Sequence, residues 1–224
     1  MNDVAPAPDP ALAAGDGYRF DLDGGHLALD FANTISRREA PDDSRERLTH
    51  YGRLVTWAVE AGLSTEKDAA RLRAEATRRP RAAAAAMRRA VALREEIFSL
   101  FVSIARDERP PDPALRALNA ALPGALAALR VGPAEGKFGW RFVHGEDDLT
   151  PMLSPVVRAA AELLTSAELA RVRECGSDTC FWLFLDASKN GTRRWCDMKT
   201  CGNRAKARRH YHREKTSVRR KRPS

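Results

Sequence analysis

Apolar residues recur at every third or fourth position through much of the first three quarters of the chain. That period places them on one face of an α-helix, so each such stretch predicts an amphipathic helix. Gly62 stands where a glycine commonly ends a helix, and Ser64 is suited to cap the next one. The helices predicted in this way cover 27–35, 48–59, 64–79, 82–106, 114–121 and 150–166.

A different pattern marks residues 129–143. Two short apolar runs flank a loop that contains Gly and Pro, and the second run holds Phe138, Trp140 and Phe142. Alternation on both sides of such a loop predicts a β-hairpin. The fold class expected for this part of the chain is therefore mainly α with a small β-hairpin.

The beginning of the chain has a composition of its own. Residues 1–17 are rich in Ala, Pro, Asp and Gly and predict a disordered leader ahead of a helical domain over 18–165. The leader has neither the basic start nor the apolar centre of a signal peptide, and no window of the chain is apolar for about 18 residues. We therefore expect no membrane partner and a cytoplasmic location.

Charge is distributed unevenly along the chain. The formal net charge is +8, yet residues 171–224 alone carry 16 Lys and Arg against 5 Asp and Glu, a net of +11. The remaining residues carry 22 basic and 25 acidic side chains, a net of −3. A solvated, solubilising tail is one reading, but an Arg-rich segment directly after a cysteine cluster favours a polyanionic partner.

All four cysteines fall within this last part of the chain, in the pattern C-x4-C-x15-C-x4-C. Structural disulfides are not expected in a cytoplasmic protein, and two closely spaced pairs are typical of a closed zinc site with four thiolate ligands. Reduced buried thiols or redox sensing are the alternatives, and neither requires paired spacing. We expect one structural Zn²⁺ per chain, with these ligands: Cys175, Cys180, Cys196 and Cys201.

The connection between the two cysteine pairs predicts how they meet. It contains Asn190-Gly191, a strong signal for a two-residue hairpin turn that would return Cys196 to Cys180. Cys201 would then begin the last helix, an order that outlines a treble-clef-like zinc finger over 171–213. Such a finger is too small to fold without its metal. Its own small core is expected from Phe181, Leu183, Leu185 and Trp195.

Beyond the last cysteine, residues 203–222 contain neither Pro nor Gly and are strongly basic. They predict a basic helix suited to a major groove and its phosphates, with a basic tail over 214–224. The residues expected to contact nucleic acid are Arg193, Arg194, Asn203, Arg204, Lys206, Arg208, Arg209, Arg213 and Lys215.

Two residues in the first turn of this helix have competing interpretations. Asn203 and Arg204 are placed to read base edges, because Asn pairs well with adenine and Arg with guanine. Equally, Asn203 is suited to cap the helix, and Arg204 to pair with Asp186 or Asp197.

Three polar residues stand out in the first predicted helix. His26, Asp30 and Asn33 lie at i, i+4 and i+7 amid apolar neighbours and are candidates to line a small ligand pocket. The alternative is that Asp30 and Asn33 bond to neighbouring backbone groups and shape the start of the domain. The chain matches no common catalytic motif, so we do not expect an enzyme.

The stretch "RRWCDMKTCGNRAKARRHYHR", together with "FLDASKNGTRRWC", resembles the CGNR zinc finger, whose name is spelled by residues 201–204. The stretches "HLALDFANT" and "LVTWAVEAGL" resemble the ABATE domain, which accompanies this finger in bacterial proteins. The resemblance covers about 18–213. It implies a stress-responsive transcription regulator with a helical sensor-like half and a DNA-binding finger.

The leading hypothesis is thus a DNA-binding regulator whose N-terminal half senses a small-molecule effector or forms a homo-oligomer. A second is an RNA- or ribosome-associated zinc protein, because an Arg-rich helix also binds structured RNA. A third is a zinc module whose basic helix docks on an acidic protein surface.

Overall fold

The computed structural model describes residues 17–38, 45–134, 136–208 and 211. The expected leader, apart from Gly17, and the expected basic tail lie outside these residues, as do Arg209, Arg213 and Lys215.

The described chain is mainly helical, as the sequence predicts, and it contains three short antiparallel strand pairs, of which only the one near the middle of the chain was predicted. The helices are α1 (Leu27–Ala32), α2 (Tyr51–Glu60), α3 (Glu66–Arg78), α4 (Pro80–Ala105), α5 (Asp112–Ala127) and α6 (Leu153–Leu164), with the short turns η3 (Ala167–Arg171) and η4 (Met198–Gly202). The strand pairs are β1 (Ile35–Ser36) with β2 (Arg45–Glu46), β3 (Leu129–Ala134) with β4 (Lys137–Phe142), and β5 (Val172–Glu174) with β6 (Leu183–Leu185).

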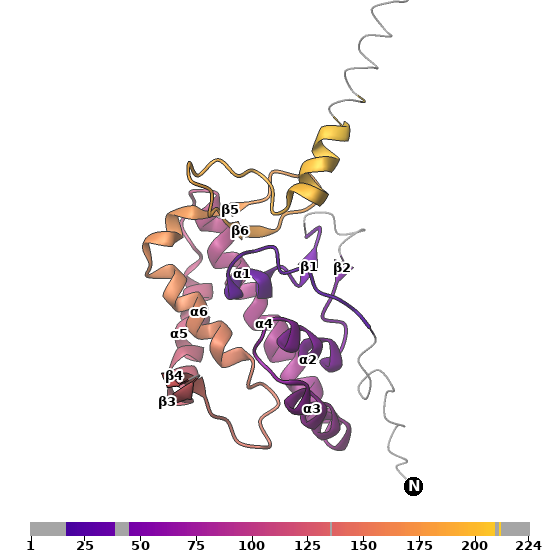
Figure 1. The fold of residues 1–224 in the computed structure, drawn as a ribbon, viewed down its shortest axis with the longest axis vertical. Coiled ribbons are helices and arrows are strands. Elements are labelled where there is room, and N and C mark those ends of the chain that lie inside the picture. Colours follow the sequence, from indigo (N-terminus) through magenta and orange to yellow (C-terminus); the bar gives the residue numbers. More distant parts are fainter. Residues whose placement is uncertain (1–16, 39–44, 135, 209–210, 212–224) are drawn as a thin grey trace, which may run out of the picture.

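Helix α4 is the axis of the helical body (Figure 1). Its 26 residues run beside α1, α2, α3 and α5, and its far end reaches β5 and β6. Ala83, Ala86 and Ala90 are buried along its first half. Small side chains allow neighbouring helices to approach closely, so the alanine-rich run is a packing surface as well as a good helix former.

One charged residue on α4 is buried among apolar neighbours. The side chain of Arg94 is 2% exposed, and its two terminal nitrogens lie 2.6 and 2.7 Å from the carboxylate oxygens of Glu46. Glu95 supplies a second carboxylate to the same guanidinium. A buried charge requires such partners, and the pair fastens β2 to the middle of α4.

Several helix boundaries in the first half of the body differ from the predicted ones; α2, for example, begins at Tyr51 and not at residue 48. Helix α1 ends at Ala32, and Ile35 belongs to β1 instead. Thr65, rather than Ser64, caps α3, because its hydroxyl accepts a hydrogen bond from the amide of Asp68. The hydroxyl of Thr65, and not that of Ser64, reaches the free amides in the first turn of α3.

Helix α5 is longer than its predicted end at residue 121. It continues through Pro123 and Gly124 to Ala127. A proline removes one backbone hydrogen bond from a helix interior. The helix persists because Leu118 and Ala125, on either side of the proline, are buried against the body.

The predicted hairpin near the middle of the chain is confirmed as β3–β4. Val131 stands opposite Trp140 and Pro133 opposite Phe138, so their side chains share one face of the ribbon. Phe138 and Trp140 are 77% and 63% exposed. The hairpin lies at the end of the body remote from the cysteines (Figure 1).

Candidate metal centre and nucleic-acid interface

The first cysteine pair lies in the loop of a β-hairpin. Cys175 directly follows β5, and Cys180 lies three residues before β6. The two strands pair antiparallel, and the amide of Cys175 donates to the carbonyl of Trp182 at 2.8 Å. This hairpin fixes both cysteines of the first pair at one end of a rigid ribbon.

The predicted hairpin around Asn190-Gly191 is wrong, because β6 pairs with β5 and not with the residues after Gly191. Asp186 explains the difference. Its buried carboxylate accepts hydrogen bonds from the amides of Ser188 and Arg193, which folds this segment into a loop. Burial raises the pKa of Asp186, but these hydrogen bonds outweigh it and the pKa is lowered.

The second cysteine pair is brought back by the end of that loop. The amide of Gly176 donates to the carbonyl of Arg194 at 2.9 Å, and the amide of Cys196 approaches the sulfur of Cys175 at 3.5 Å. Asp197 then caps η4 by accepting a hydrogen bond from the amide of Thr200. The loop thus returns Cys196 to the first cysteine pair, as the predicted hairpin was expected to do, but without a strand that pairs with β6 on the downstream side.

Gly202, the second residue of the CGNR tetrapeptide, lies close to two neighbouring side chains. A Cβ at this position would lie 2.6 Å from the sulfur of Met198 and 3.3 Å from the indole of Trp195. Both contacts are closer than side chains normally approach. Because Met198 is a flexible, half-exposed side chain that can move aside, the glycine eases the packing of η4 beside the cysteines but is not strictly required for it.

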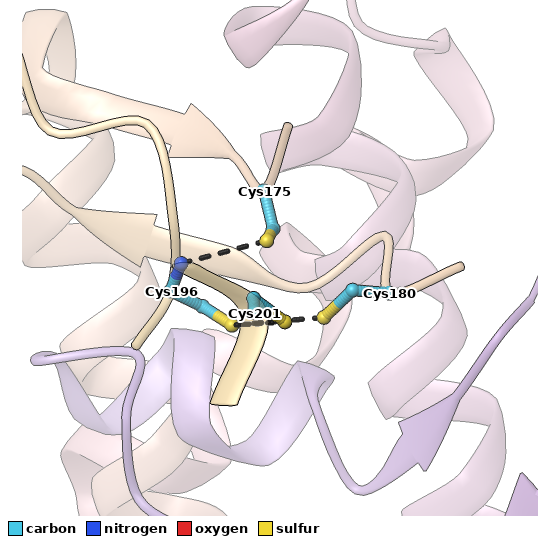
Figure 2. Close-up of side chains that lie close together, drawn as sticks. All are labelled: Cys175, Cys180, Cys196 and Cys201. Carbon is cyan, nitrogen blue, oxygen red and sulfur yellow. Dashed lines mark hydrogen bonds between the residues drawn. The ribbon is translucent and has the colours of Figure 1, made fainter. Parts of the chain in front are cut away.

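The four sulfurs form a compact cluster (Figure 2). All lie within 4.8 Å of one another, with 3.6 Å between Cys180 and Cys196 and 3.7 Å between Cys196 and Cys201. Ligands at about 2.3 Å around a tetrahedral zinc ion stand roughly 3.8 Å apart. The donor set and its spacing fit one Zn²⁺, and all four cysteines are free thiols.

The sulfurs also perturb one another electrostatically. Hydrogen bonding to the neighbouring sulfur of Cys180 lowers the pKa of Cys175 to about 7. Hydrogen bonding to Cys175 lowers the pKa of Cys201 and raises that of Cys196. Four thiolates this close together repel strongly, and a divalent cation at their centre removes that repulsion.

Strand β6 joins the cysteine centre to the helical body. Trp182 and Phe184 face the cysteines, whereas Leu183 and Leu185 belong to the core of the helical body. The prediction that Leu183 and Leu185 belong to a separate core within the finger is therefore wrong. Alternation along a strand allows one short segment to serve two clusters.

Asn33 makes the most direct joint between the two parts. Its side-chain amide donates to the carbonyl of Leu183 at 2.8 Å, and its side-chain oxygen accepts from the Leu183 amide at 2.9 Å. Asn33 is 2% exposed. The indole of Trp182 adds a hydrogen bond to the carbonyl of Ile35 at 3.0 Å. A single buried side chain thus replaces a neighbouring strand on one side of β6.

Asp30 and His26 have separate local roles. Asp30 accepts a hydrogen bond from the amide of Gly24 at 2.8 Å, and the carbonyl of Gly24 accepts one from Leu185. Burial raises the pKa of Asp30 to about 6. His26 caps α1 by accepting from the amide of Ala28, and burial lowers the pKa of His26.

The structure therefore does not bring His26, Asp30 and Asn33 together in a ligand pocket. None of them lines the hollows described below. Asp30 and Asn33 follow the alternative interpretation, hydrogen bonding to backbone, although Asn33 bonds to a segment 150 positions away.

The helix after the cysteines begins as expected, and residues 203–208 are helical. Arg204 and Arg208 are exposed, and Arg204 approaches the hydroxyl of Thr179 at 3.5 Å. Arg208 forms an ion pair with Asp178. Lys206 is exposed.

Neither structural alternative for the first turn holds as stated. Asn203 donates to the carbonyl of Lys199 rather than capping the helix, which is the role of Asp197. The guanidinium of Arg204 approaches the hydroxyl of Thr179 instead of pairing with Asp186 or Asp197.

The two arginines before Trp195 differ. Arg193 is half-buried, stacks 4.7 Å from the ring of Phe184, and donates to the carbonyls of Trp195 and Cys196. Its guanidinium holds the second cysteine pair in place instead of facing a partner. Arg194 is exposed, with its guanidinium 5.6 Å from the Trp195 ring.

Two hollows meet at the basic helix. One, of about 330 Å³, is lined by Arg194, Arg204 and Arg208. The other, of about 410 Å³, lies between the finger and the helical body, and Arg204 and Arg208 line it too. The helical body lines the second hollow with three arginines, Arg37, Arg45 and Arg47, and with the carboxylates of Asp21 and Asp23.

Sequence reasoning missed these last three arginines. They lie more than 150 residues before the basic helix in the chain, and no motif marks them. Arg47 stacks 4.6 Å from the ring of Trp182 and pairs with Asp21 at 3.0 Å, while Arg37 donates to the carbonyl of Thr179. Only the folded chain shows that arginines of both parts line the same hollow.

Comparison with protein families gives two matches. Residues 25–167 match ABATE, described as "Putative stress-induced transcription regulator", and residues 171–214 match the CGNR zinc finger. No curated protein matches the chain. All four cysteines lie within the zinc-finger match, and the expectation of one structural Zn²⁺ is confirmed. In the described part of the chain, no helix combines the length and apolarity needed to cross a membrane.

Proposed function

The chain belongs to the ABATE family, and on this premise we propose that it is a transcription regulator that binds DNA through its zinc finger and is not an enzyme. The observation that carries the proposal is the position of the basic helix. Cys201 lies in η4, immediately before it, so a zinc ion held by the four cysteines fixes the direction in which the helix leaves the protein.

The charge of this region supports a nucleic-acid partner. Residues 171–224 carry a net of +11, while the rest of the chain carries −3. A DNA duplex presents a dense row of phosphates, and a clustered set of Lys and Arg is the usual counterpart.

The geometry supports a proposal with different tasks for different side chains. Asn203 and Arg204 occupy the first turn of the helix, where side chains of a helix inserted in a major groove reach base edges. Arg194, Lys206 and Arg208 are exposed around them and suit phosphate contacts. The proposed interface no longer includes Arg193, whose guanidinium is engaged inside the finger.

The arginines of the helical body extend the same surface. Arg37, Arg45 and Arg47 line a hollow together with Arg204 and Arg208, so DNA bound along the helix would pass over both parts of the protein. This arrangement would make the angle between finger and body part of the binding site. A ligand that changed that angle would change DNA affinity, which is the behaviour expected of a regulator.

Selection of a preferred DNA site from a random pool, followed by binding measurements over a salt series, tests the proposal. Arg208→Ala should weaken binding to all sequences alike and reduce the log–log salt slope by about one unit, as expected for one lost phosphate contact. Arg204→Ala should relax the preference at one base pair, at a cost of about 1–3 kcal/mol.

The matched control is Arg116→Ala, which removes the same charge from an exposed position on α5. It should leave both the slope and the sequence preference unchanged. The proposal fails if no DNA sequence is enriched, or if RNA competes with the selected DNA at equal concentration.

A further inference from the structure

One face of the β3–β4 ribbon is made entirely of apolar side chains. Residues that stand opposite each other in an antiparallel ladder point to the same side, so three successive pairs share this face, which we call the apolar face. The pairs are Leu129 with Phe142, Val131 with Trp140, and Pro133 with Phe138. The face carries no charge, and its one polar side-chain group is the indole N–H of Trp140.

The outer part of the apolar face is open to solvent. Phe138, Trp140 and Val131 are 77%, 63% and 58% exposed, and they are the three most exposed large apolar side chains of the described residues. Pro133 is exposed beside them. Isolated apolar residues are common on protein surfaces, whereas adjacent ones on a flat ribbon mark an interaction surface.

The opposite face of the ribbon is cationic. Alternation along the strands places Arg130, Lys137 and Arg141 there, and all three are exposed. The side chain of Arg141 lies across Gly132, where an added Cβ would be 2.6 Å from its Nε. An anionic lipid surface requires cations and apolar side chains directed to the same side. Here they point apart, so the apolar face suits a protein surface better than a membrane.

A ribbon of this kind is expected to need a covering layer. An isolated two-stranded hairpin is marginally stable in water, and it becomes stable when its apolar face packs against another layer. Leu129 and Phe142 are half-buried near the base of the ribbon, while its outer half has no such cover. A second ribbon packed face to face, at about 10 Å, supplies that layer.

The charges beside the apolar face are compatible with a second copy of the chain. The guanidinium of Arg158 on α6 lies 5.8 Å from the ring of Trp140, and its Nε lies 2.7 Å from a carboxylate oxygen of Glu162. In a two-fold contact each surface meets itself. An edge that carries both signs offers an opposite charge to each group of the other copy, whereas the cations of one sign stay on the far face of the ribbon.

The exposed area of the apolar face matches what a dimer needs. Phe138 and Trp140 expose roughly 300 Å² together, and Val131 and Pro133 add roughly 100 Å². A two-fold contact would therefore bury roughly 800 Å² of apolar surface. Stable interfaces bury about 1,200–2,000 Å² in total, of which about 65% is apolar in homodimers. The patch reaches the lower end of this range, which predicts a reversible dimer.

We propose that the apolar face is the contact of a homodimer, in which two chains pack their β3–β4 ribbons face to face with Trp140 near the two-fold axis. The ribbon lies at the end of the body remote from the cysteines, so the contact leaves both fingers uncovered (Figure 1). The proposal goes beyond DNA binding and does not depend on it.

Sedimentation equilibrium of the zinc-loaded full chain without DNA, over a concentration series up to about 200 µM, tests the proposal. We expect a monomer–dimer equilibrium with a Kd on the order of 10 µM, as suits an interface of this size. Trp140→Glu should raise the Kd at least about 100-fold, because two carboxylates would be buried opposite each other. Lys137→Glu, on the cationic face of the same ribbon, is the control and should leave the Kd within about twofold.

A charge exchange identifies the partner as a second copy. Trp140→Lys should also be monomeric by itself. An equimolar mixture of Trp140→Glu and Trp140→Lys should form a dimer, because opposite charges then meet across the two-fold axis. Both variants should keep the parent's melting temperature, since the side chain they replace is mostly exposed.

The proposal is overturned if the parent chain remains monomeric at about 200 µM, or if it dimerises and both Trp140 variants do so equally well. A mixture that stays monomeric would contradict a two-fold contact centred on Trp140. Binding to phosphatidylglycerol vesicles that the parent shows and Trp140→Glu lacks would assign the face to a lipid surface instead. Since DNA is absent, these results are independent of whether the finger binds DNA.

Discussion

The cysteine centre and the helical body are ordered by different forces. Around the cysteines, the described residues form a buried cluster of only three cysteines, Trp182 and Phe184. The helical body buries a large apolar core drawn from all six helices. A region with so little apolar burial depends on its metal, whereas the body folds by the hydrophobic effect.

The two regions nevertheless share strand β6. Phe184 of this strand and Trp182 just before it belong to the cysteine cluster, whereas Leu183 and Leu185 belong to the core of the body. The part of the chain that depends on the metal is therefore smaller than the zinc-finger match over residues 171–214. The boundary between the two kinds of order lies along one strand and not at a linker.

The largest effect is expected from removing zinc or replacing any one cysteine ligand with serine. Structural zinc supplies binding energy on the order of 10 kcal/mol, so the loops at 175–181 and 193–202 should lose their order. The amides of Leu183 and Leu185 should remain protected, because they bond to Asn33 and Gly24 in the body. Hydrogen exchange before and after chelation measures both.

The opposite pattern would contradict this division. If Leu183 and Leu185 exchange as fast as the cysteine loops after chelation, β6 depends on the metal and the finger is a separate unit. If the cysteine loops stay protected, the metal is not what orders them.

The next effect tests the joint itself. Asn33→Ala removes two hydrogen bonds and leaves the buried amide and carbonyl of Leu183 unpaired. We expect a loss of about 3 kcal/mol in the free energy of unfolding, measured by urea denaturation. Asn119→Ala, at an exposed position on α5, should cost less than about 0.5 kcal/mol. Equal losses in the two variants would show that Asn33 is not a joint.

A smaller, pH-dependent effect is expected at Asp30. Burial raises its folded pKa to about 6, above the ordinary value of 3.8, so the folded state binds the proton more tightly. This contribution to stability is fully present below about pH 4 and is lost as the pH rises through 6. Above pH 6 the buried carboxylate costs up to about 3 kcal/mol.

Asp30→Asn keeps an oxygen to accept from Gly24 but cannot ionise. The variant should therefore be more stable than the parent at pH 7, and the difference should shrink to near zero below pH 4. Denaturation at several pH values checks this, with Asp147→Asn, at an exposed position, as the control. A constant difference across this range would exclude a perturbed carboxyl group.

The smallest effect concerns the basic helix. Asp178 pairs with Arg208 and competes with any phosphate for it. Asp178→Ala should strengthen DNA binding by about two- to fivefold at low salt, a gain that fades as salt rises. Asp147→Ala, far from the helix, should have no effect. Weaker binding by Asp178→Ala would mean that the ion pair positions Arg208 instead of occupying it.

The metal centre could be predicted from the sequence because its ligands are identical side chains at short, regular spacing, from Cys175 to Cys201. The helices were predictable for a similar reason, since helical periodicity is a local property. Reliance on local signals also explains where the helix prediction failed. Pro123 and Gly124 predicted a helix end that burial of the neighbouring residues overrides.

Features that depend on distant partners could not be predicted. Asn190-Gly191 is a valid turn signal, but the partner of β6 lies upstream, and Asp186 turns the downstream chain into a loop. The pairing of Asn33 with Leu183 joins segments 150 residues apart. The convergence of Arg37 with Arg204 likewise exists only in the folded chain.

The most direct test of the account is the affinity of the full chain for its selected DNA site before chelation, after chelation and after zinc is restored. We predict that chelation abolishes sequence-specific binding and leaves weak, salt-sensitive binding by the basic tail, and that zinc restores specificity. Specific binding that survives complete zinc removal would contradict the claim that the metal centre positions the DNA-binding helix.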